Sequence, residues 1–400
     1  MFVKESKKIN RLPAYVFARI NQLTREARFA GKDIINLGMG NPDQPTPPHI
    51  VQGLIKASLE GKNHRYSASR GVYNLRRDMC RWYKKRYDVT LDPENEVCAV
   101  IGTKEGLMHL MFAILDEGDM VMVPNPTYPI HLYGPIMAGG DIINVRCHKD
   151  VDFLEEVEKK LAETFPKPRT LIVSYPHNPT TLCAPDDFFP RLVKLAKRED
   201  LLVIHDLAYA DIAFDGYRPP SFLQTPGAKE VGIEFYSLSK SFNMAGWRIG
   251  FAVGNAEVIK ILARFKSYAD YGIFQPIQIA AMKALQGSYE CVEEISRTYQ
   301  DRRDLLVDGL NKLGWPVELP RATMYLWAEI PQQFSHMGSL DFSLMLFEQA
   351  GVVVSPGIGF GEWGDNFVRI ALVENEKRSK QALRNIRRVF REAGAINGME

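Results

Sequence analysis

The chain has 400 residues, of which 46% are hydrophobic and 24% are charged, and its formal net charge is only +2 at neutral pH. This length exceeds that of one small domain and predicts two or three units that share a large buried core. The near-neutral charge gives no electrostatic argument for nucleic acid or for an anionic membrane surface as a partner.

The N-terminal residues, the cysteines and the histidines also limit the compartment and the chemistry that we expect. Residues 1–8 are charged and lack the apolar region of a secretory signal, and no apolar run approaches the length of a membrane span. The five cysteines are scattered without C-x-x-C spacing, and the eight histidines form no H-E-x-x-H motif. We therefore expect reduced thiols in a cytoplasmic protein, with no membrane partner and no metal site.

The first part of the chain predicts an arm followed by two helices. Residues 1–45 contain a short amphipathic segment at 15–30 and a Gly- and Pro-rich run at 38–45, where backbone could approach a ligand. Helices are expected at 48–59 and 73–87.

From residue 97 onward, short apolar strands alternate with helical segments. The strands are expected at 97–101, 120–123, 142–145, 171–174, 201–205, 233–236 and 249–253. This alternation is typical of an α/β domain with a mostly parallel sheet that is buried on both faces. A long helical stretch at 257–285, broken near Pro276, closes the domain.

Beyond residue 288 the order of the elements changes. A long helix comes first and another helix comes last, and between them we expect a strand at 324–330, a helix near 342–350, and strands at 352–355 and 367–372. This is an α+β unit with its own core. The expected organisation is thus an arm that packs with the small domain (1–45), a large ligand-binding domain (46–287) and a small C-terminal domain (288–400).

One polar segment lies between the last two strands of the large domain. Lys240 is placed there on a Ser- and Gly-rich bend, and a lysine that loses its solvent loses proton affinity and becomes a nucleophile toward carbonyls. Ser237, Ser239 and Arg248 flank it and are suited to clamping a phosphate. The set suggests a phosphorylated aldehyde cofactor, pyridoxal phosphate (PLP), although an exposed loop with ordinary surface charges would have the same local sequence.

Other polar residues follow the carboxyl ends of the predicted strands, where open α/β sheets bind ligands. Thr103 and Lys104 begin an apolar helix whose N–H groups could cradle a phosphate, and Tyr128 could stack on a planar ring. Asn178 lies in a rigid proline turn, and Asp206 ends an apolar strand, where an acid needs a cation. Each residue has an ordinary alternative role as a cap, a turn or a packing residue. Their joint occurrence favours a site for a phosphorylated pyridine aldehyde.

A second glycine pattern competes with this interpretation. Residues 359–364 match G-x-G-x-x-G, which is the fingerprint of dinucleotide-binding proteins. The next segment is a predicted strand, whereas the fingerprint requires a helix. A nicotinamide or ATP enzyme is therefore a weak alternative.

Taken together, these motifs resemble the class I PLP-dependent aminotransferases of the aspartate aminotransferase fold (fold-type I), and the resemblance covers essentially the whole chain. The matching pieces are G-M-G-N-P-D at 38–43, Tyr66 with Gly71, G-T-K-E-G at 102–106, P-T-Y at 126–128, H-N-P-T at 177–180, D-L-A-Y at 206–209, S-L-S-K at 237–240, G-W-R-I-G at 246–250 and V-R-I-A around Arg369. Further segments resemble bacterial glutamate–pyruvate (alanine) aminotransferases, with the LL-diaminopimelate aminotransferases as near neighbours.

The resemblance implies a role for each matching residue. Lys240 would bind the cofactor aldehyde and carry the proton of the substrate Cα, Asp206 would pair with the pyridinium N–H, and Tyr209 with Asn178 would hydrogen-bond the phenolic oxygen. The phosphate would be held by Thr103, Lys104, Ser237, Ser239 and Arg248, and by Tyr66 from the partner subunit, while Tyr128 would stack on the ring. The substrate would be bound by Arg369, which grips its α-carboxylate, and by Gly40, Tyr15 and Asn178.

The implied function is transfer of an amino group between alanine/pyruvate and glutamate/2-oxoglutarate by a homodimer with shared active sites. No basic residue occurs at 267–276, where aspartate-specific relatives use an arginine of the partner chain. Ser69 stands where diaminopimelate enzymes place a glutamate, which disfavours that diamino acid. An LL-diaminopimelate aminotransferase and a PLP-dependent carbon–sulfur lyase nevertheless remain as alternatives.

Overall fold

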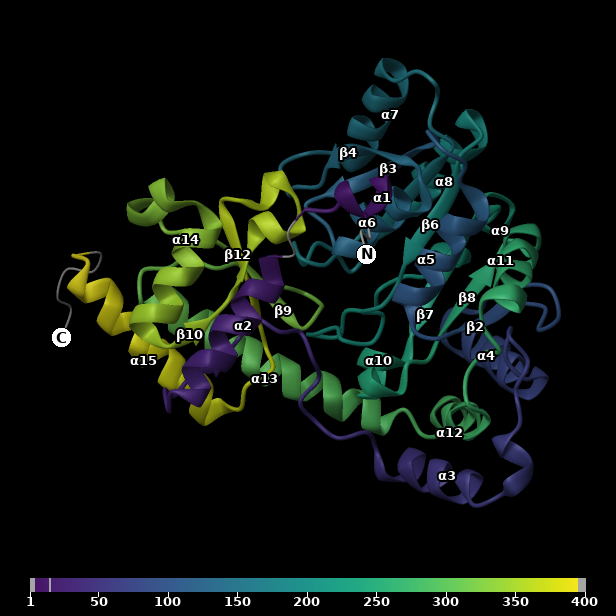
Figure 1. The fold of residues 1–400 in the computed structure, drawn as a ribbon, viewed down its shortest axis with the longest axis horizontal. Helices are drawn as coiled ribbons and strands as arrows, with labels where there is room; N and C mark the ends of the chain where they lie inside the picture. The colour runs from purple at the N-terminus through teal and green to yellow at the C-terminus, as the bar shows by residue number, and fades with distance from the viewer. Residues whose placement is uncertain (1–3, 14–15, 395–400) are drawn as a thin grey trace.

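The computed structural model describes residues 4–13 and 16–394, and its largest element is a seven-stranded sheet (Figure 1). The strand order is β2-β8-β7-β6-β5-β3-β4, with β2 (Val97–Val100), β3 (Met120–Asn125), β4 (Asp141–Arg146), β5 (Thr170–Ser174), β6 (Leu202–Asp206), β7 (Gly232–Ser237) and β8 (Gly250–Gly254). All pairs are parallel except those that β8 makes with β2 and β7. The expected α/β fold with a mostly parallel sheet is confirmed. Strand β8 is reversed because residues 238–249 supply only short helical turns, whereas a parallel crossover needs a longer connection.

Both faces of this sheet are buried, as its continuous apolar strands predict. Along β2, Val97 and Ala99 belong to one hydrophobic cluster, while Cys98 and Val100 belong to another on the opposite face. One face is covered by α5 (Thr103–Ile114), α6 (Pro129–Ala138) and α11 (Ala256–Ala269). The other is covered by α4 (Tyr73–Tyr87), α7 (Phe153–Glu163), α8 (Phe188–Glu199) and α12 (Gln275–Gln286), with α3 (Pro48–Ser58) packed on α12. The short helices α9 (Ala228–Val231) and α10 (Leu238–Ser241) flank β7.

Local sequence explains where several helices begin and end. The Asp152 side chain accepts hydrogen bonds from the first N–H groups of α7, and Asn255 does the same for α11. The helix predicted over 257–285 is interrupted at residues 270–274, and Pro276 stands in the first turn of α12, where a proline costs no hydrogen bond. The predicted break near Pro276 is confirmed.

A second, antiparallel sheet has the order β11-β12-β9 and lies in the other half of the molecule (Figure 1). Its strands are β9 (Tyr325–Glu329), β11 (Ser355–Pro356) and β12 (Phe367–Ala371). The helices around it are α13 (Glu290–Lys312), α14 (Gly338–Met345), which continues as a π-helical turn at Leu346–Ala350, and α15 (Glu376–Glu392). A separate hydrophobic cluster around Trp315, Phe342 and Phe390 forms the core of this unit.

The single strand predicted at 352–355 is wrong. Its first half is β10 (Val352–Val353), which pairs in parallel with β1 (Ile35–Asn36) of the N-terminal arm, and its second half is β11 of the small sheet. The segment changes partner at residue 354. The sequence could not show this, since the partner strand lies more than 300 residues away and is two residues long.

The N-terminal arm contacts both halves of the molecule. Helix α1 (Lys7–Asn10) lies against α6, where Lys8 Nζ donates to the Ala138 carbonyl oxygen at 3.3 Å. Helix α2 (Val16–Phe29) instead packs through Ile20 and Ala27 against Val353 of the small unit. The expected packing against the small unit is therefore only part of the arrangement. The domain boundaries at 45 and 287 stay a prediction, and no helix in the described part of the chain is long and apolar enough to span a membrane.

Candidate active site

A pocket of about 580 Å³ lies beyond the carboxyl ends of the central strands, at the side of the small sheet. Its wall includes twelve of the residues that the sequence analysis selected: Gly40, Thr103, Lys104, Tyr128, Asn178, Asp206, Tyr209, Ser237, Ser239, Lys240, Arg248 and Arg369. The parallel strands β5, β6 and β7 end at one edge of the large sheet, so the residues that end or follow them meet there. Gly40 of the arm and Arg369 of the second sheet complete the wall.

Lys240 stands on α10, the helical turn that follows β7. Its Nζ donates a hydrogen bond to the carbonyl oxygen of Gly40 at 2.8 Å, and no carboxylate of the described residues forms an ion pair with it. Burial lowers the pKa of this amine, and the charges of Arg369 and Arg248 act in the same direction. The amine therefore gives up its proton more easily than an exposed lysine does, and is more nucleophilic near neutral pH.

Hydrogen-bond donors surround one end of the pocket. Helix α5 begins at Thr103 and Lys104, whose N–H groups have no acceptor within the helix. Gly102 precedes them with φ of 79°, and a Cβ at this position would lie 2.1 Å from Nη2 of Arg248. Only glycine therefore allows the guanidinium to lie this close to the helix start. Ser237 adds a hydroxyl from the end of β7, and the whole group suits a dianionic phosphate.

Asp206, the last residue of β6, belongs to a buried polar chain. One carboxylate oxygen lies 3.0 Å from Nε2 of His131, and Nδ1 of His131 lies 2.8 Å from the Thr127 hydroxyl. The other oxygen accepts the N–H of Ala208 at 3.2 Å. All three side chains are buried, so His131 and Thr127 fix the orientation of the carboxylate toward the pocket.

A pair of tyrosines lies opposite Lys240. The hydroxyls of Tyr209 and Tyr325 are 2.9 Å apart, and Asn178 Nδ2 donates to the Tyr209 hydroxyl at 3.3 Å. Burial raises the pKa of Tyr209. Burial has the same tendency at Tyr325, but the positive charges of Arg369 and Lys240 overcome it and lower the pKa of that phenol.

Arg369 of β12 is buried at the boundary between the two sheets. Its Nη1 donates to Asn178 Oδ1 at 2.8 Å, its Nη2 donates to the Gly38 carbonyl oxygen at 3.2 Å, and its Nε is unpartnered. The guanidinium lies 4.0 Å from the centre of the Tyr325 ring and 4.5 Å from that of Phe360. Such a cation, held in place and facing no carboxylate, suits a bidentate contact with a carboxylate ligand.

Comparison with known proteins agrees with this geometry. Residues 32–386 match the family model of aminotransferase class I and II. The chain is 53% identical to the glutamate-pyruvate aminotransferase AlaC of Escherichia coli (strain K12), over 97% of this chain and 94% of the relative. It is 44% identical to an LL-diaminopimelate aminotransferase of Moorella thermoacetica, over 97% and 99%.

Two solved structures are similar over nearly their whole length. Substrate-bound BacF from Bacillus subtilis has a TM-score of 0.92 and 40% identity, covering 97% of this chain and 98% of that one. An aspartate aminotransferase from Thermotoga maritima has a TM-score of 0.89 and 27% identity, covering 97% and 100%. The chain is a class I/II aminotransferase.

Membership in this aminotransferase family implies pyridoxal phosphate and substrates that are amino acids and 2-oxo acids. The pocket residues fit the cofactor. The donors around the start of α5 match a phosphate, the partly desolvated amine of Lys240 matches an aldehyde, and Asp206 offers a carboxylate to a ring nitrogen. Gly40 allows the Tyr325 hydroxyl to lie close to the backbone at the pocket wall, because a Cβ there would lie 1.9 Å from that hydroxyl.

One selected residue, Tyr66, is not in the wall of this aminotransferase pocket, and another, Tyr15, lies outside the described residues. Tyr66 is 84% exposed and its ring lies 4.5 Å from that of Tyr271, on the surface of the chain. The expected contribution of Tyr66 concerns the active site of a second subunit and stays a prediction.

The sequence analysis missed three groups in or behind the pocket. Tyr325, which contacts Tyr209 and Arg369, was treated only as part of a strand, and His131, which supports Asp206, was not selected. Phe360 was found only inside the misleading glycine pattern, and its ring covers Arg369. The signal for Tyr325 would have been a large polar aromatic within an apolar strand beside the predicted site.

Proposed function

We propose that this aminotransferase moves an amino group between alanine/pyruvate and glutamate/2-oxoglutarate, with pyridoxal phosphate as its cofactor. The observation that carries the choice of substrates is the 53% identity to a glutamate-pyruvate aminotransferase over 97% of the chain. The pocket supports this choice. Among the described residues of its wall, the one acidic side chain is Asp206, which already faces His131. A diamino acid would thus find no free carboxylate for its distal ammonium.

The bound cofactor supplies an electron sink for the pair left on the substrate Cα when its proton is removed. We assign the removal and return of that proton to Lys240, because burial lowers the pKa of its amine and leaves a larger unprotonated fraction than in an exposed lysine. Asp206, oriented by His131, would pair with the ring nitrogen and favour its protonated form. Tyr209 and Asn178, which are hydrogen-bonded to each other, would hold the phenolic oxygen of the ring.

The remaining pocket residues bind and orient. We assign the phosphate to the N–H groups of Thr103 and Lys104 together with Ser237, Ser239 and Arg248, and the ring face to Tyr128. Arg369 takes the α-carboxylate of the amino acid, with Asn178 and the backbone at Gly40 beside it. The rings of Tyr325 and Phe360 exclude water from this pair, which strengthens it.

The proposal includes a twofold homodimer in which Tyr66 reaches the phosphate of the other subunit. Support comes from exposed aromatic side chains in residues 268–274, where Tyr271 contacts Tyr66: Tyr268 is 89% exposed, Tyr271 65% and Phe274 47%. Aromatic groups of this kind are enriched in interfaces and are costly to leave in water. The five cysteines are all unpaired, which supports the proposed cytoplasmic location.

A panel of amino donors, tested with pyruvate and with 2-oxoglutarate, checks the substrate assignment. We expect alanine with 2-oxoglutarate, and glutamate with pyruvate, to give the highest kcat/KM values. Equal or higher values for aspartate or for aromatic amino acids would contradict the assignment. The protein should also show visible absorbance that disappears when Lys240 is replaced by alanine.

The second candidate is LL-diaminopimelate aminotransferase, which the 44% identity to the Moorella thermoacetica enzyme favours. In this structure Ser69 donates its hydroxyl to the Asp270 carbonyl oxygen at 2.8 Å, and Ser69 carries no charge to receive a second ammonium. Including LL-diaminopimelate in the donor panel separates the two functions. A kcat/KM above that of alanine would replace the first proposal by the second.

A further inference from the structure

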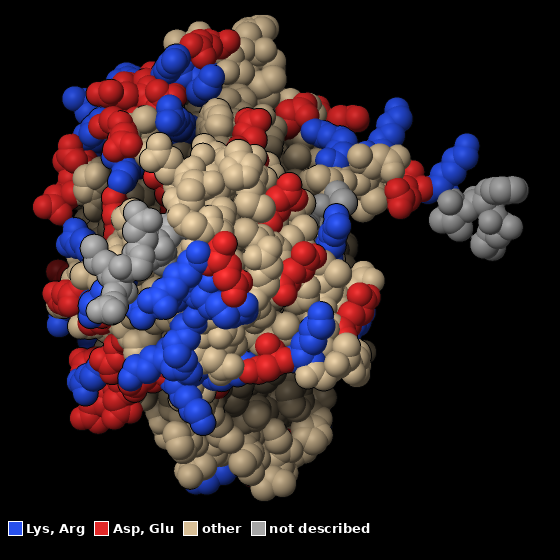
Figure 2. Space-filling model, turned by 90° about the vertical axis from the view of Figure 1, so that its left-hand side faces the viewer, with Lys and Arg blue, Asp and Glu red and all other residues tan. Residues whose placement is uncertain are grey.

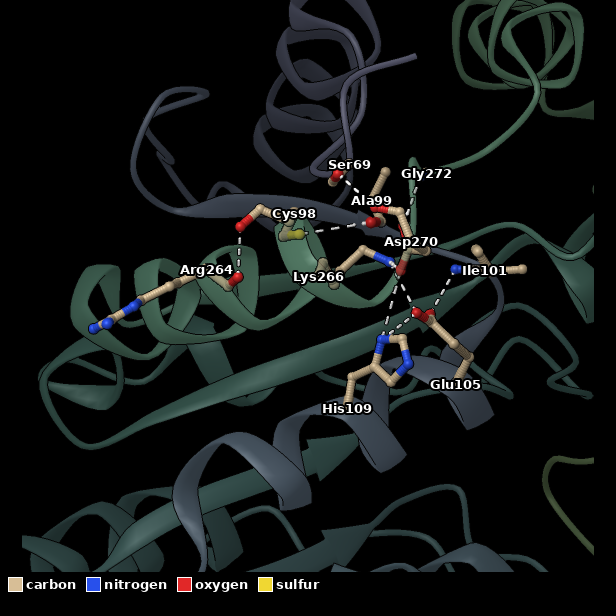
Figure 3. A network of polar contacts seen from close by, with 11 residues as sticks. Ser69, Cys98, Ala99, Ile101, Glu105, His109, Arg264, Lys266, Asp270 and Gly272 are labelled. Atoms are coloured by element: carbon tan, nitrogen blue, oxygen red, sulfur yellow. Dashed lines mark hydrogen bonds and ion pairs between the residues drawn. The ribbon is translucent and has the colours of Figure 1, made fainter. Parts of the chain in front are cut away.

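A cluster of four ionisable side chains lies outside the pocket, between α5 and the end of α11 (Figure 3). Lys266 is fully buried, and its Nζ donates to Glu105 Oε1 at 2.8 Å and to Asp270 Oδ2 at 2.9 Å. His109 Nδ1 lies 2.6 Å from the same oxygen of Glu105. Glu105, His109 and Asp270 present ligand atoms within 4.8 Å of one another, as a metal site would. The Lys266 ammonium already bonds both carboxylates, however, so the position of a cation is taken by a side chain.

One end of this cluster fixes the turn that begins α5. Glu105 lies in the first turn of the helix, and its Oε2 accepts the N–H of Ile101 at 2.7 Å. The residues between Ile101 and Glu105 are Gly102, Thr103 and Lys104, which form the part of the pocket that we assign to the phosphate. The ion pair with Lys266 holds Glu105 in place, so it also holds this turn.

The other end fixes the loop after α11. Asp270 Oδ1 accepts the N–H of Gly272 at 2.6 Å, and the Asp270 carbonyl oxygen accepts the Ser69 hydroxyl at 2.8 Å (Figure 3). Gly272 has φ of 76°, and a Cβ there would lie 2.6 Å from the carbonyl oxygen of Ala68. The loop is thus packed closely against the segment that follows Tyr66.

Tyr66 itself extends from this supported segment. Its ring contacts Tyr271 of the same loop, with the ring centres 4.5 Å apart. Gln278 of α12 strengthens the segment further, because its amide donates to Ser67 Oγ at 2.8 Å and accepts the N–H of Val72 at 2.9 Å. The position of Tyr66 therefore depends on the loop that Asp270 and Lys266 organise.

We propose that Glu105, Lys266 and Asp270 are positioning residues for cofactor binding that act on two active sites at once. Through Glu105 the cluster sets the phosphate cradle of its own subunit, and through Asp270 and Ser69 it sets the Tyr66 that reaches the phosphate in the other subunit. The inference rests on the proposed cofactor and dimer. It adds a buried ion-pair cluster outside the pocket that controls how tightly the phosphate is held.

The test is a double-mutant cycle on the affinity of the cofactor-free protein for pyridoxal phosphate, measured from tryptophan fluorescence. Tyr66→Phe removes one hydroxyl, and Asp270→Asn removes the charge that Lys266 holds while keeping the acceptor for Gly272. Each variant should raise the dissociation constant by roughly tenfold. The double variant should be little weaker than Tyr66→Phe alone, because Asp270 acts through Tyr66.

Two further variants keep the test decisive. Ser69→Ala removes only the bond from the Tyr66 segment to the loop, and should weaken binding by roughly threefold without adding to Tyr66→Phe. Glu257→Gln, at the exposed ion pair with Lys260 in the same helix, is the matched control and should leave the affinity unchanged.

The outcomes separate this inference from the proposed function. If Asp270→Asn and Ser69→Ala lower the melting temperature but leave the affinity unchanged, the cluster is only structural and the inference is overturned. If their effects on the affinity multiply with that of Tyr66→Phe, the cluster does not act through Tyr66, and the inference that it serves two active sites is overturned. If the wild-type protein fails to bind pyridoxal phosphate, the proposed cofactor itself is overturned and the inference with it.

Discussion

Lys240 and Lys266 are both withdrawn from solvent, but their surroundings give them opposite properties. Among the described residues, the one hydrogen-bond acceptor of Lys240 is the Gly40 carbonyl oxygen, and burial together with two nearby guanidinium groups lowers the pKa of Lys240. Lys266 is more deeply buried, yet Glu105 and Asp270 overcome the effect of burial and raise its pKa. Removal from water thus makes a lysine reactive only where no carboxylate stabilises its charge.

The chain as a whole and the wall of the pocket also differ in how their charges are balanced. Figure 2 shows one face of the molecule, on which acidic and basic side chains are mixed near one edge while a band of basic side chains crosses the middle. The chain has 50 basic and 48 acidic residues, so the two charges nearly balance over the whole sequence. In the described part of the pocket wall, by contrast, Lys104, Lys240, Arg248 and Arg369 face one carboxylate, that of Asp206. Such a concentration of cations is what a phosphate and a carboxylate ligand require.

Replacing each lysine should have different consequences, and the largest effect is expected at Lys240. Lys240→Ala should reduce kcat by roughly 10⁴-fold or more, since it removes both the nucleophile and the proton carrier. The stability of the cofactor-free protein should not fall, because a desolvated amine without a counter-charge is lost. Activity is measured in a coupled transaminase assay and stability by urea unfolding, with Lys260→Ala on the exposed face of α11 as the control. Turnover within tenfold of wild type would remove Lys240 from its role.

Lys266→Met should act mainly on the stability of the protein and not on the rate of the reaction. The substitution keeps the length of the side chain but leaves the carboxylates of Glu105 and Asp270 together without a cation. We expect the free energy of unfolding to fall by about 3–5 kcal/mol. The measurement is urea unfolding of the cofactor-free protein. A triple variant, Lys266→Met with Glu105→Gln and Asp270→Asn, should recover much of the loss, and equal stability of the single and triple variants would contradict the electrostatic explanation.

How much of this contrast could be predicted from the sequence differs between the two lysines. Lys240 was identified because its neighbours Ser237, Ser239 and Arg248 lie within twelve residues of it, so local sequence already describes its surroundings. Lys266 was not noticed. It lies in an amphipathic helix together with the exposed Lys260, and its partner Glu105 is 161 residues away. Nothing in the local pattern distinguishes the two helical lysines.

The fold and the site follow the same rule. The parallel sheet could be predicted because apolar strands and helices alternate along the chain, and most of the selected pocket residues because they follow these strands directly. Gly40 and Arg369 were selected only through the family resemblance. The parallel pairing of β1 with β10 and the contact between His131 and Asp206 could not be predicted, since each depends on a register between distant segments. Likewise, Tyr325 enters the pocket from the second sheet, and the sequence contains no information on how the two sheets are placed.

Replacing Arg369 tests whether its guanidinium binds the α-carboxylate of the substrate. Arg369→Ala should raise KM for alanine by about 10- to 100-fold, because a charge-assisted, bidentate contact with the α-carboxylate is lost. Arg369→Lys keeps the charge without the planar fork and should recover only part of the affinity. Steady-state kinetics with alanine and 2-oxoglutarate measure both. A KM for Arg369→Ala within twofold of wild type would mean that the carboxylate binds elsewhere.

The smallest effect is the pH dependence of stability, in which the two lysines should have opposite signs. The pKa of Lys240 is lower in the folded protein than its unfolded value of about 10.5, so the unfolded chain binds more protons between these two values and the contribution of Lys240 to stability rises with pH in that window. The pKa of Lys266 is raised, so its contribution is fully present below about 10.5 and is lost as the pH rises through the folded-state value. Each group can change the free energy of unfolding by at most about 1.4 kcal/mol per pH unit.

Urea unfolding of the cofactor-free wild type, Lys240→Met and Lys266→Met between pH 7 and pH 11 isolates each contribution by difference. The Lys240 difference should vary below pH 10.5, while the Lys266 difference stays constant there and shrinks above it. If both differences varied in the same direction over the same pH window, the carboxylates around Lys266 would not explain why the pKa values of the two lysines differ.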